Sequence, residues 1–256
     1  MRHSKAIGIV GGVGPYAGLD LNRKIFDHTV AKTDQEHLKV ILFSFSVDIP
    51  DRTKFLLGNE RINPADAIFK VLQKLESVGV EVAGIPCNTF HAPEIFDVLI
   101  KRLKENRNHI EVVHMIKEVA SFIKKYYPHV NSLGILGTNG TVYSRIYTKI
   151  LQPEGFKIIY PDKEVQYSMV HPSIYDPIFG IKAKSNPVTA TAQKTIKQAM
   201  ENIIEHGAEC IILGCTELPL AIETKSTNGK PIIDPALILA RALIGKVAPD
   251  KLRPLS

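Results

Sequence analysis

Short apolar runs alternate with amphipathic segments along most of the chain. Runs typical of buried strands lie at residues 6–10, 39–47, 80–85, 111–114, 132–136, 156–160, 210–213 and 231–233. Between them, apolar residues recur at spacings of three and four, which predicts helices, notably over residues 64–78, 93–104, 115–127 and 188–205. Strands that alternate with helices indicate an α/β fold, in which mostly parallel sheets have helices on both faces.

The two halves of the chain carry the same pattern. Residues 7–14 resemble residues 133–140, and residues 79–89 resemble residues 207–217. The separation between the first and the second segment is nearly the same in both halves, which indicates an internal repeat. In the second segment of each half, a cysteine follows an apolar strand. We therefore expect two pseudo-symmetric, doubly wound domains, each delivering one cysteine to a cleft between them.

The end of the chain is expected to return to the first domain. Asp234 and the proline after it are typical of a helix start. The helix that follows, over residues 236–247, should pack against the first domain. The predicted domains are therefore residues 1–114 with 221–256, and residues 115–220.

Composition narrows the class of protein. Of the 256 residues, 45% are hydrophobic, enough for a large core, and no run approaches the roughly 18 apolar residues of a membrane span. Residues 1–5 are too short and polar for a signal peptide, so we expect a cytoplasmic protein without a membrane partner.

The net charge of +6 does not indicate a nucleic-acid partner. The densest basic cluster, Lys101, Arg102, Lys104 and Arg107, lies on an amphipathic helix and is typical of a solvated face. The chain has no Trp, and no aromatic run interleaves with the basic residues. A mildly basic protein suits a small anionic substrate instead.

The three cysteines are Cys87, Cys210 and Cys215. An odd number without a C-x-x-C pair argues against disulfides and for free thiols in a reducing compartment. Cys210 lies within an apolar strand and is expected in the core. The other two end their strands and precede polar pairs, which are Asn88 with Thr89 and Thr216 with Glu217.

Two thiols that face one cleft are suited to inverting a carbon that bears a hydrogen. The ends of parallel strands line the ligand crevice, and backbone amides at a helix start favour a thiolate or a carboxylate. One thiolate removes the proton, and the opposite thiol returns another. The carbanion intermediate needs fixed hydrogen-bond donors, for which the candidates are Asn88, Thr89, Thr141 and Thr216.

Four segments resemble those of the aspartate/glutamate racemase superfamily, and they are closest to its aspartate racemase branch. They are residues 11–15, 49–53, 86–89 and 214–217, and the resemblance covers nearly the whole chain in order. It implies racemisation by two cysteines without pyridoxal phosphate, another cofactor or a metal. It also implies a site between two domains, and a homodimer.

The resemblance further assigns substrate-binding roles. Arg52 matches the family's substrate-binding arginine, and Lys182 matches the lysine that binds the distal carboxylate of an acidic substrate. The predicted site comprises catalytic Cys87 and Cys215, substrate-binding Asp51, Arg52, Thr53, Asn88, Thr89, Phe90, Thr141, Lys182 and Thr216, and supporting Gly12 and Glu217.

Aspartate is the favoured substrate, because Thr-Glu follows the second cysteine where glutamate racemases typically carry Thr-His. Glutamate or a broader amino-acid range stay open as substrates. A related decarboxylase or isomerase that uses enolate chemistry is the alternative reaction.

Other functions fit the sequence less well. Gly12, Gly14 and Ala17 match a dinucleotide-binding fingerprint, but the acidic residue it needs is expected about 20 residues on, and Asp48 is much further away. Cys87 and three histidines, His91, His114 and His171, do not form a compact set of zinc ligands. A binding module without catalysis would not need two thiols.

Overall fold

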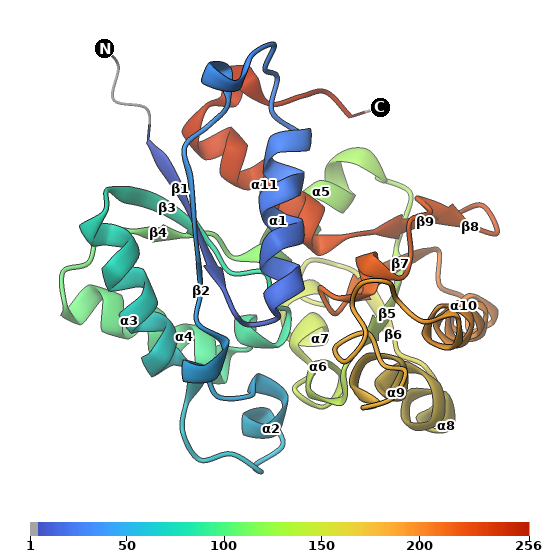
Figure 1. Cartoon of the computed structure of the whole chain (residues 1–256). Helices are drawn as coiled ribbons and strands as arrows, with labels where there is room; N and C mark the ends of the chain where they lie inside the picture. The colour runs from blue at the N-terminus through green and yellow to red at the C-terminus, as the bar shows by residue number, and fades with distance from the viewer. Residues whose placement is uncertain (1–4, 256) are drawn as a thin grey trace.

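The computed structural model describes residues 5–255; residues 1–4 and 256 of the predicted first domain lie outside that range. The chain forms two α/β units side by side (Figure 1). The first sheet is parallel, in the order β2-β1-β3-β4, and consists of β1 (Ala6–Gly11), β2 (Val40–Ser44), β3 (Val80–Gly84) and β4 (Glu111–Val112). These strands confirm the predicted α/β class.

The second sheet repeats this order. It runs β6-β5-β7-β9-β8 and consists of β5 (Ser132–Gly137), β6 (Lys157–Ile159), β7 (Cys210–Gly214), β8 (Ser226–Thr227) and β9 (Lys230–Ile233). The first four of its strands are parallel, and β8 adds an antiparallel edge. Strands β5, β6, β7 and β9 therefore correspond in position to β1, β2, β3 and β4. The sequence repeat covers two of these pairs, β1 with β5 and β3 with β7.

Helices cover both faces of each sheet, as the spacing of their apolar residues requires. On the first sheet, one face packs against α3 (Pro64–Ser77) and α4 (Pro93–Glu105), and the other against α1 (Pro15–Asp27) and α11 (Pro235–Val247). On the second, one face packs against α9 (His171–Tyr175) and α10 (Ala190–Glu205), and the other against α5 (Met115–Tyr126) and α7 (Ile146–Leu151). Three further short α-helices of the described residues are α2 (Arg52–Leu56), α6 (Asn139–Tyr143) and α8 (Lys163–Val165).

The two units exchange one helix each. Helix α5 follows the last strand of the first sheet but packs on the second, whereas α11 follows β9 of the second sheet but packs on the first. Leu239 and Leu243 of α11 join Ile7 and Ile9 of β1 in one core cluster. Gly84 of β3 leaves the room this requires, since a Cβ there would lie 2.7 Å from the Leu243 side chain. The two exchanged helices also pack against each other.

The predicted domain boundary is wrong for one segment. Strand β9 pairs with β7, with Ile211 opposite Ile232, so residues 226–233 belong to the second sheet and not to the first domain. Helix α11 packs on the first domain as expected. An apolar run as short as residues 231–233 contains no sign of which sheet edge it joins.

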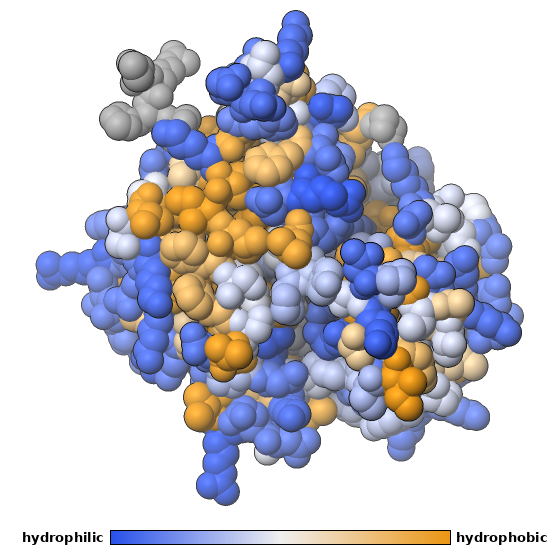
Figure 2. Space-filling model, in the orientation of Figure 1, coloured by the Kyte–Doolittle hydropathy of each residue, from blue (hydrophilic) through white to orange (hydrophobic). Residues whose placement is uncertain are grey.

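Strand β2 forms an open, apolar edge of the first sheet, called the β2 edge below. Within residues 5–255, β2 pairs only with β1. Figure 2 shows apolar side chains gathered over this side of the first domain. The β2 edge comprises the half-buried Val40, Ile41, Leu42 and Phe43 and the exposed Leu19 and Val47. In the same described range, no helix combines the length and apolarity needed to cross a bilayer.

Candidate active site

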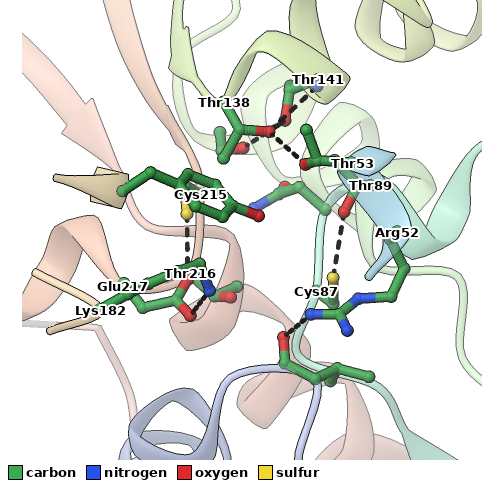
Figure 3. A pocket seen from close by; sticks show the side chains of 14 residues that line it. Arg52, Thr53, Cys87, Thr89, Thr138, Thr141, Lys182, Cys215, Thr216 and Glu217 are labelled. Carbon is green, nitrogen blue, oxygen red and sulfur yellow. Dashed lines mark hydrogen bonds and ion pairs between the residues drawn. The ribbon is translucent and has the colours of Figure 1, made fainter. Parts of the chain in front are cut away.

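A small cavity, about 20 Å³ in volume, lies where the carboxyl ends of β3 and β7 face each other between the two units. Ten of the predicted site residues line it (Figure 3): Arg52, Thr53, Cys87, Asn88, Thr89, Thr141, Lys182, Cys215, Thr216 and Glu217. Both units contribute to this set, so the site is complete only when the two are packed together.

The other three predicted residues lie outside the lining. Phe90 is fully buried in the core under the first sheet. Asp51 caps the first turn of α2 and accepts a hydrogen bond from the Tyr175 hydroxyl at 3.1 Å. Gly12 has a φ of 80°, and a Cβ there would lie 2.7 Å from the Ser46 backbone nitrogen. Each of the three is adjacent in sequence to a residue that lines the cavity: Thr89, Arg52 and Val13.

Four further residues line the cavity: Val13, Thr138, Tyr175 and Gly214. The sequence repeat aligns Thr138 with Gly12, so comparing the halves position by position would have found it. Tyr175 lies in α9, in a segment without a counterpart among the quoted motifs, and sequence reasoning had no signal for it.

The two cysteines are positioned by matching turns. Each thiol lies beyond the end of a central strand, and each cysteine is 6% exposed. The Cys87 Sγ lies 3.3 Å from the Thr89 hydroxyl, and the Cys87 carbonyl is 2.9 Å from Nδ1 of His91. The Thr216 hydroxyl donates to the Pro86 carbonyl at 2.8 Å, which ties the two cysteine turns together across the cleft.

Arg52 places a buried cation beside Cys87 (Figure 3). Its guanidinium donates to the Val13 carbonyl at 2.7 Å and to the Pro50 carbonyl at 3.2 Å, which fixes its orientation. Burial alone would lower the pKa of Arg52, but attraction to Cys87 and Asp51 raises it above its usual value. The cation is therefore permanent and stabilises negative charge at Cys87 or on a bound carboxylate.

Glu217 links the second cysteine to Lys182. Cys215 Sγ donates to Glu217 Oε2 at 3.0 Å, and Lys182 forms an ion pair with Oε1 of the same carboxylate. Burial opposes ionisation of Glu217, but Lys182 overcomes it and lowers the pKa of the carboxyl. Gly14 makes room for Glu217, since a Cβ at Gly14 would overlap Oε1.

Burial and then Glu217 raise the pKa of the Cys215 thiol well above its usual value. For Lys182, burial lowers the pKa, but Glu217 and Cys215 together raise it above the usual range. At neutral pH, Cys215 is therefore a thiol that lies between a carboxylate and a cation.

A chain of hydroxyls forms a third side of the cavity. Thr53 and Thr138 lie 3.2 Å apart, Thr138 and Thr141 lie 3.3 Å apart, and Thr141 donates to the Gly214 carbonyl at 3.1 Å. Hydroxyls both donate and accept hydrogen bonds, so this chain can reorient toward a carboxylate. The cavity thus combines two thiols, two cations and neutral donors, a set suited to proton transfer beside a carboxylate.

The three histidines weighed as zinc ligands, His91, His114 and His171, are not among the residues that line the cavity. The rings of His91 and His114 are tilted by 59° with their centroids 4.8 Å apart. Across residues 5–255, no cluster of three or more His, Cys, Asp or Glu side chains is placed to hold a metal ion.

Comparisons with known proteins agree with this geometry. The family model described as Asp/Glu/Hydantoin racemase matches residues 10–243. A broad specificity amino-acid racemase of Bacillus subtilis strain 168 is 27% identical over 93% of this chain and 96% of its own. The Picrophilus torridus aspartate racemase structure has a TM-score of 0.77 and 30% identity, and the match covers 95% of this chain and 94% of that one.

A glutamate racemase of Francisella tularensis, in complex with D-glutamate, has the same fold at 18% identity, with a TM-score of 0.65 and coverage of 99% and 84%. The model match spans nearly the whole chain, including both cysteine turns and the cavity between them. The chain belongs to the Asp/Glu/Hydantoin racemase family and is an isomerase.

Proposed function

We propose that the protein interconverts L- and D-aspartate without a cofactor, by moving the α-proton between Cys87 and Cys215. The observation that carries this proposal is that both thiols line one cavity from opposite units, each beyond its own central strand. A planar carbanion held between them would lose a proton on one face and gain one on the other.

The cations on the two sides of the cavity support an acidic substrate. Arg52 is fixed by two backbone carbonyls and is free to hold one carboxylate, while Lys182 lies on the other side beside Glu217. The threonine hydroxyls supply neutral donors for the charge that develops on the α-carboxylate.

Two similar proteins support an amino-acid substrate, but their names state different breadths of substrate specificity. The Picrophilus torridus protein, at 30% identity, is named an aspartate racemase, and the Bacillus subtilis protein, at 27%, is named broad specificity. Aspartate is the substrate we propose, and a broader amino-acid range is the alternative that the second name favours.

The test is proton exchange. Purified protein is incubated with L-aspartate in D₂O without added cofactor, and optical rotation and α-deuteration are followed. We expect loss of rotation with deuterium at the α-carbon. The variants Cys87→Ala and Cys215→Ala should lose racemisation by at least about 100-fold, as expected when a general acid or base is removed.

Cys210→Ala is the matched control, because this third thiol lies in a strand, fully buried and outside the cavity. It should keep its activity. Exchange with another amino acid but not aspartate would reassign the substrate. No exchange with any amino acid would favour a decarboxylase or another enolate isomerase.

We also propose that the protein is a cytoplasmic homodimer. All three cysteines are free and buried, which suits a reducing compartment. The β2 edge supports the dimer, because an apolar edge strand with unpaired backbone groups can pair with the same strand of a second copy about a two-fold axis.

A further inference from the structure

The two thiols have opposite electrostatic surroundings. Cys87 lies beside the guanidinium of Arg52 and within 3.3 Å of a neutral hydroxyl. The Cys215 thiol donates a hydrogen bond to the carboxylate of Glu217 at 3.0 Å (Figure 3). Both cysteines have the same small exposed fraction, 6%. Their charged neighbours differ: Arg52 lies beside Cys87, whereas Glu217 and its ion-pair partner Lys182 lie beside Cys215, where repulsion from Glu217 outweighs the attraction of Lys182.

The carboxylate beside Cys215 keeps its charge. Glu217 is 4% exposed, and Lys182 binds the carboxylate oxygen that does not contact the sulfur. A thiolate at Cys215 would therefore face a carboxylate across a hydrogen-bond distance, and it would lose the bond that its own proton makes. A thiolate at Cys87 faces a cation instead. Like charges in contact disfavour ionisation, and opposite charges favour it.

We propose that Glu217 holds the proton on Cys215 in the free protein, so that Cys87 is the base and Cys215 the acid of the resting site. This inference rests on the proposed racemase function. In one turnover, the α-C–H bond breaks and its proton goes to the Cys87 thiolate, while the Cys215 S–H bond breaks and its proton goes to the carbanion. The product leaves Cys87 as a thiol and Cys215 as a thiolate beside Glu217. Proton exchange with water restores the resting form.

The two enantiomers are then handled unequally. The enantiomer whose α-hydrogen faces Cys87 meets the resting form, and the other needs the rarer form with a Cys215 thiolate. The equilibrium constant between enantiomers is one, so kcat/KM must be equal for both. The enantiomer that binds the rarer form therefore has a larger KM than the other enantiomer, and its kcat is larger by the same factor.

The first test uses the free protein and iodoacetamide, which reacts with thiolates. Mass spectrometry follows each cysteine separately. We expect Cys87 to react first, and Glu217→Gln to accelerate alkylation of Cys215 by at least about tenfold, equivalent to one pKa unit. Glu223→Gln, an exposed carboxylate beyond the cavity lining, is the matched control and should keep the original pattern. An unchanged Cys215 rate in Glu217→Gln would overturn the proposal.

The second test measures turnover of both enantiomers. Glu217→Gln should bring the two KM values together, whereas a purely structural loss would lower kcat for both and leave the KM ratio unchanged. The latter result would also overturn the proposal. Cys210, in the core, should stay unalkylated in each variant if the fold is intact. Alkylation is measured without turnover, so it tests the role of Glu217 separately from the racemase function. A protein that racemises no amino acid would refute the proposed function, and the alkylation rates would still decide the role of Glu217.

Discussion

His91 holds the first cysteine turn in place as a neutral side chain. It is completely buried, its Nδ1 bonds the Cys87 carbonyl, and its ring stacks on Phe96 at 5.4 Å between centroids. Burial lowers its pKa from 6.5 to about 4. Burial also lowers the pKa of the neighbouring His114, to about 3. As the pH decreases below 6.5, the unfolded chain binds protons at these histidines and the folded protein does not. The free energy of unfolding therefore decreases as the pH is lowered.

We expect the free energy of unfolding to drop by about 2 kcal/mol between pH 7 and pH 5 from His91 alone, given its lowered pKa. Urea unfolding at the two pH values measures this change. In His91→Gln, which cannot titrate, the drop should be smaller by about that amount. Equal pH dependence in the two proteins would show that His91 is not the titrating group.

The sequence alone identified the residues that a repeat or a motif marks. Cys87 and Cys215 follow from comparing the two halves, and both line the cavity. Arg52 and Lys182 follow only from the family resemblance, because nothing in their local pattern distinguishes them from surface cations. The ion pair between Lys182 and Glu217 was not predicted, since it joins residues from distant segments that meet only after folding.

Among the elements, the apolar helix α11 is capped at its N-terminus by a charged side chain. The Asp234 side chain accepts hydrogen bonds from the backbone of Ala236 at 2.9 Å and Leu237 at 3.3 Å. Its second oxygen pairs with Lys24 of α1 at 2.5 Å. Lys24 is buried and also pairs with Asp20, so the network fixes α11 against α1.

Asp234→Ala should lower the free energy of unfolding by about 2–4 kcal/mol, because the helix loses its cap and a buried ion pair loses a member. Asn63→Ala removes a comparable cap from α3, where the capping side chain is neutral and makes no ion pair, and should cost only about 1 kcal/mol. Urea unfolding at pH 7 compares them. A cost for Asp234→Ala no larger than that for Asn63→Ala would mean that the contact with Lys24 adds nothing.

Strands and helices were predictable as elements, but their partners were not all predictable. Long amphipathic segments such as α3 and α10 match the ranges that apolar spacing predicts. The pairing of β9 with β7 and the exchange of α5 and α11 depend on contacts between the two units. Local periodicity shows which face of a helix is apolar, and not which sheet that face will cover.

For the whole molecule, the proposed dimer makes a direct prediction about mass. Leu19 and Val47 are 55% and 97% exposed at the β2 edge, so the double variant Leu19→Lys, Val47→Lys should fold but place charges in the interface. Light scattering after size exclusion should give twice the chain mass for the original protein and the single-chain mass for the variant. Ile178→Lys, at an exposed apolar residue between α9 and α10 of the second unit, is the control and should stay dimeric. A monomeric original protein would refute the dimer.

The exchange of α5 and α11 makes the two halves interdependent. A fragment that ends with β4 would lack α11, which covers β1 and β3, and one that begins at β5 would lack α5, which covers its own sheet. Neither half can bury its core alone, so the chain should fold in a single cooperative step. If a half-length chain with this element order existed on its own, two copies that exchanged their last helices would bury both cores and would bring one cysteine from each into a shared cleft.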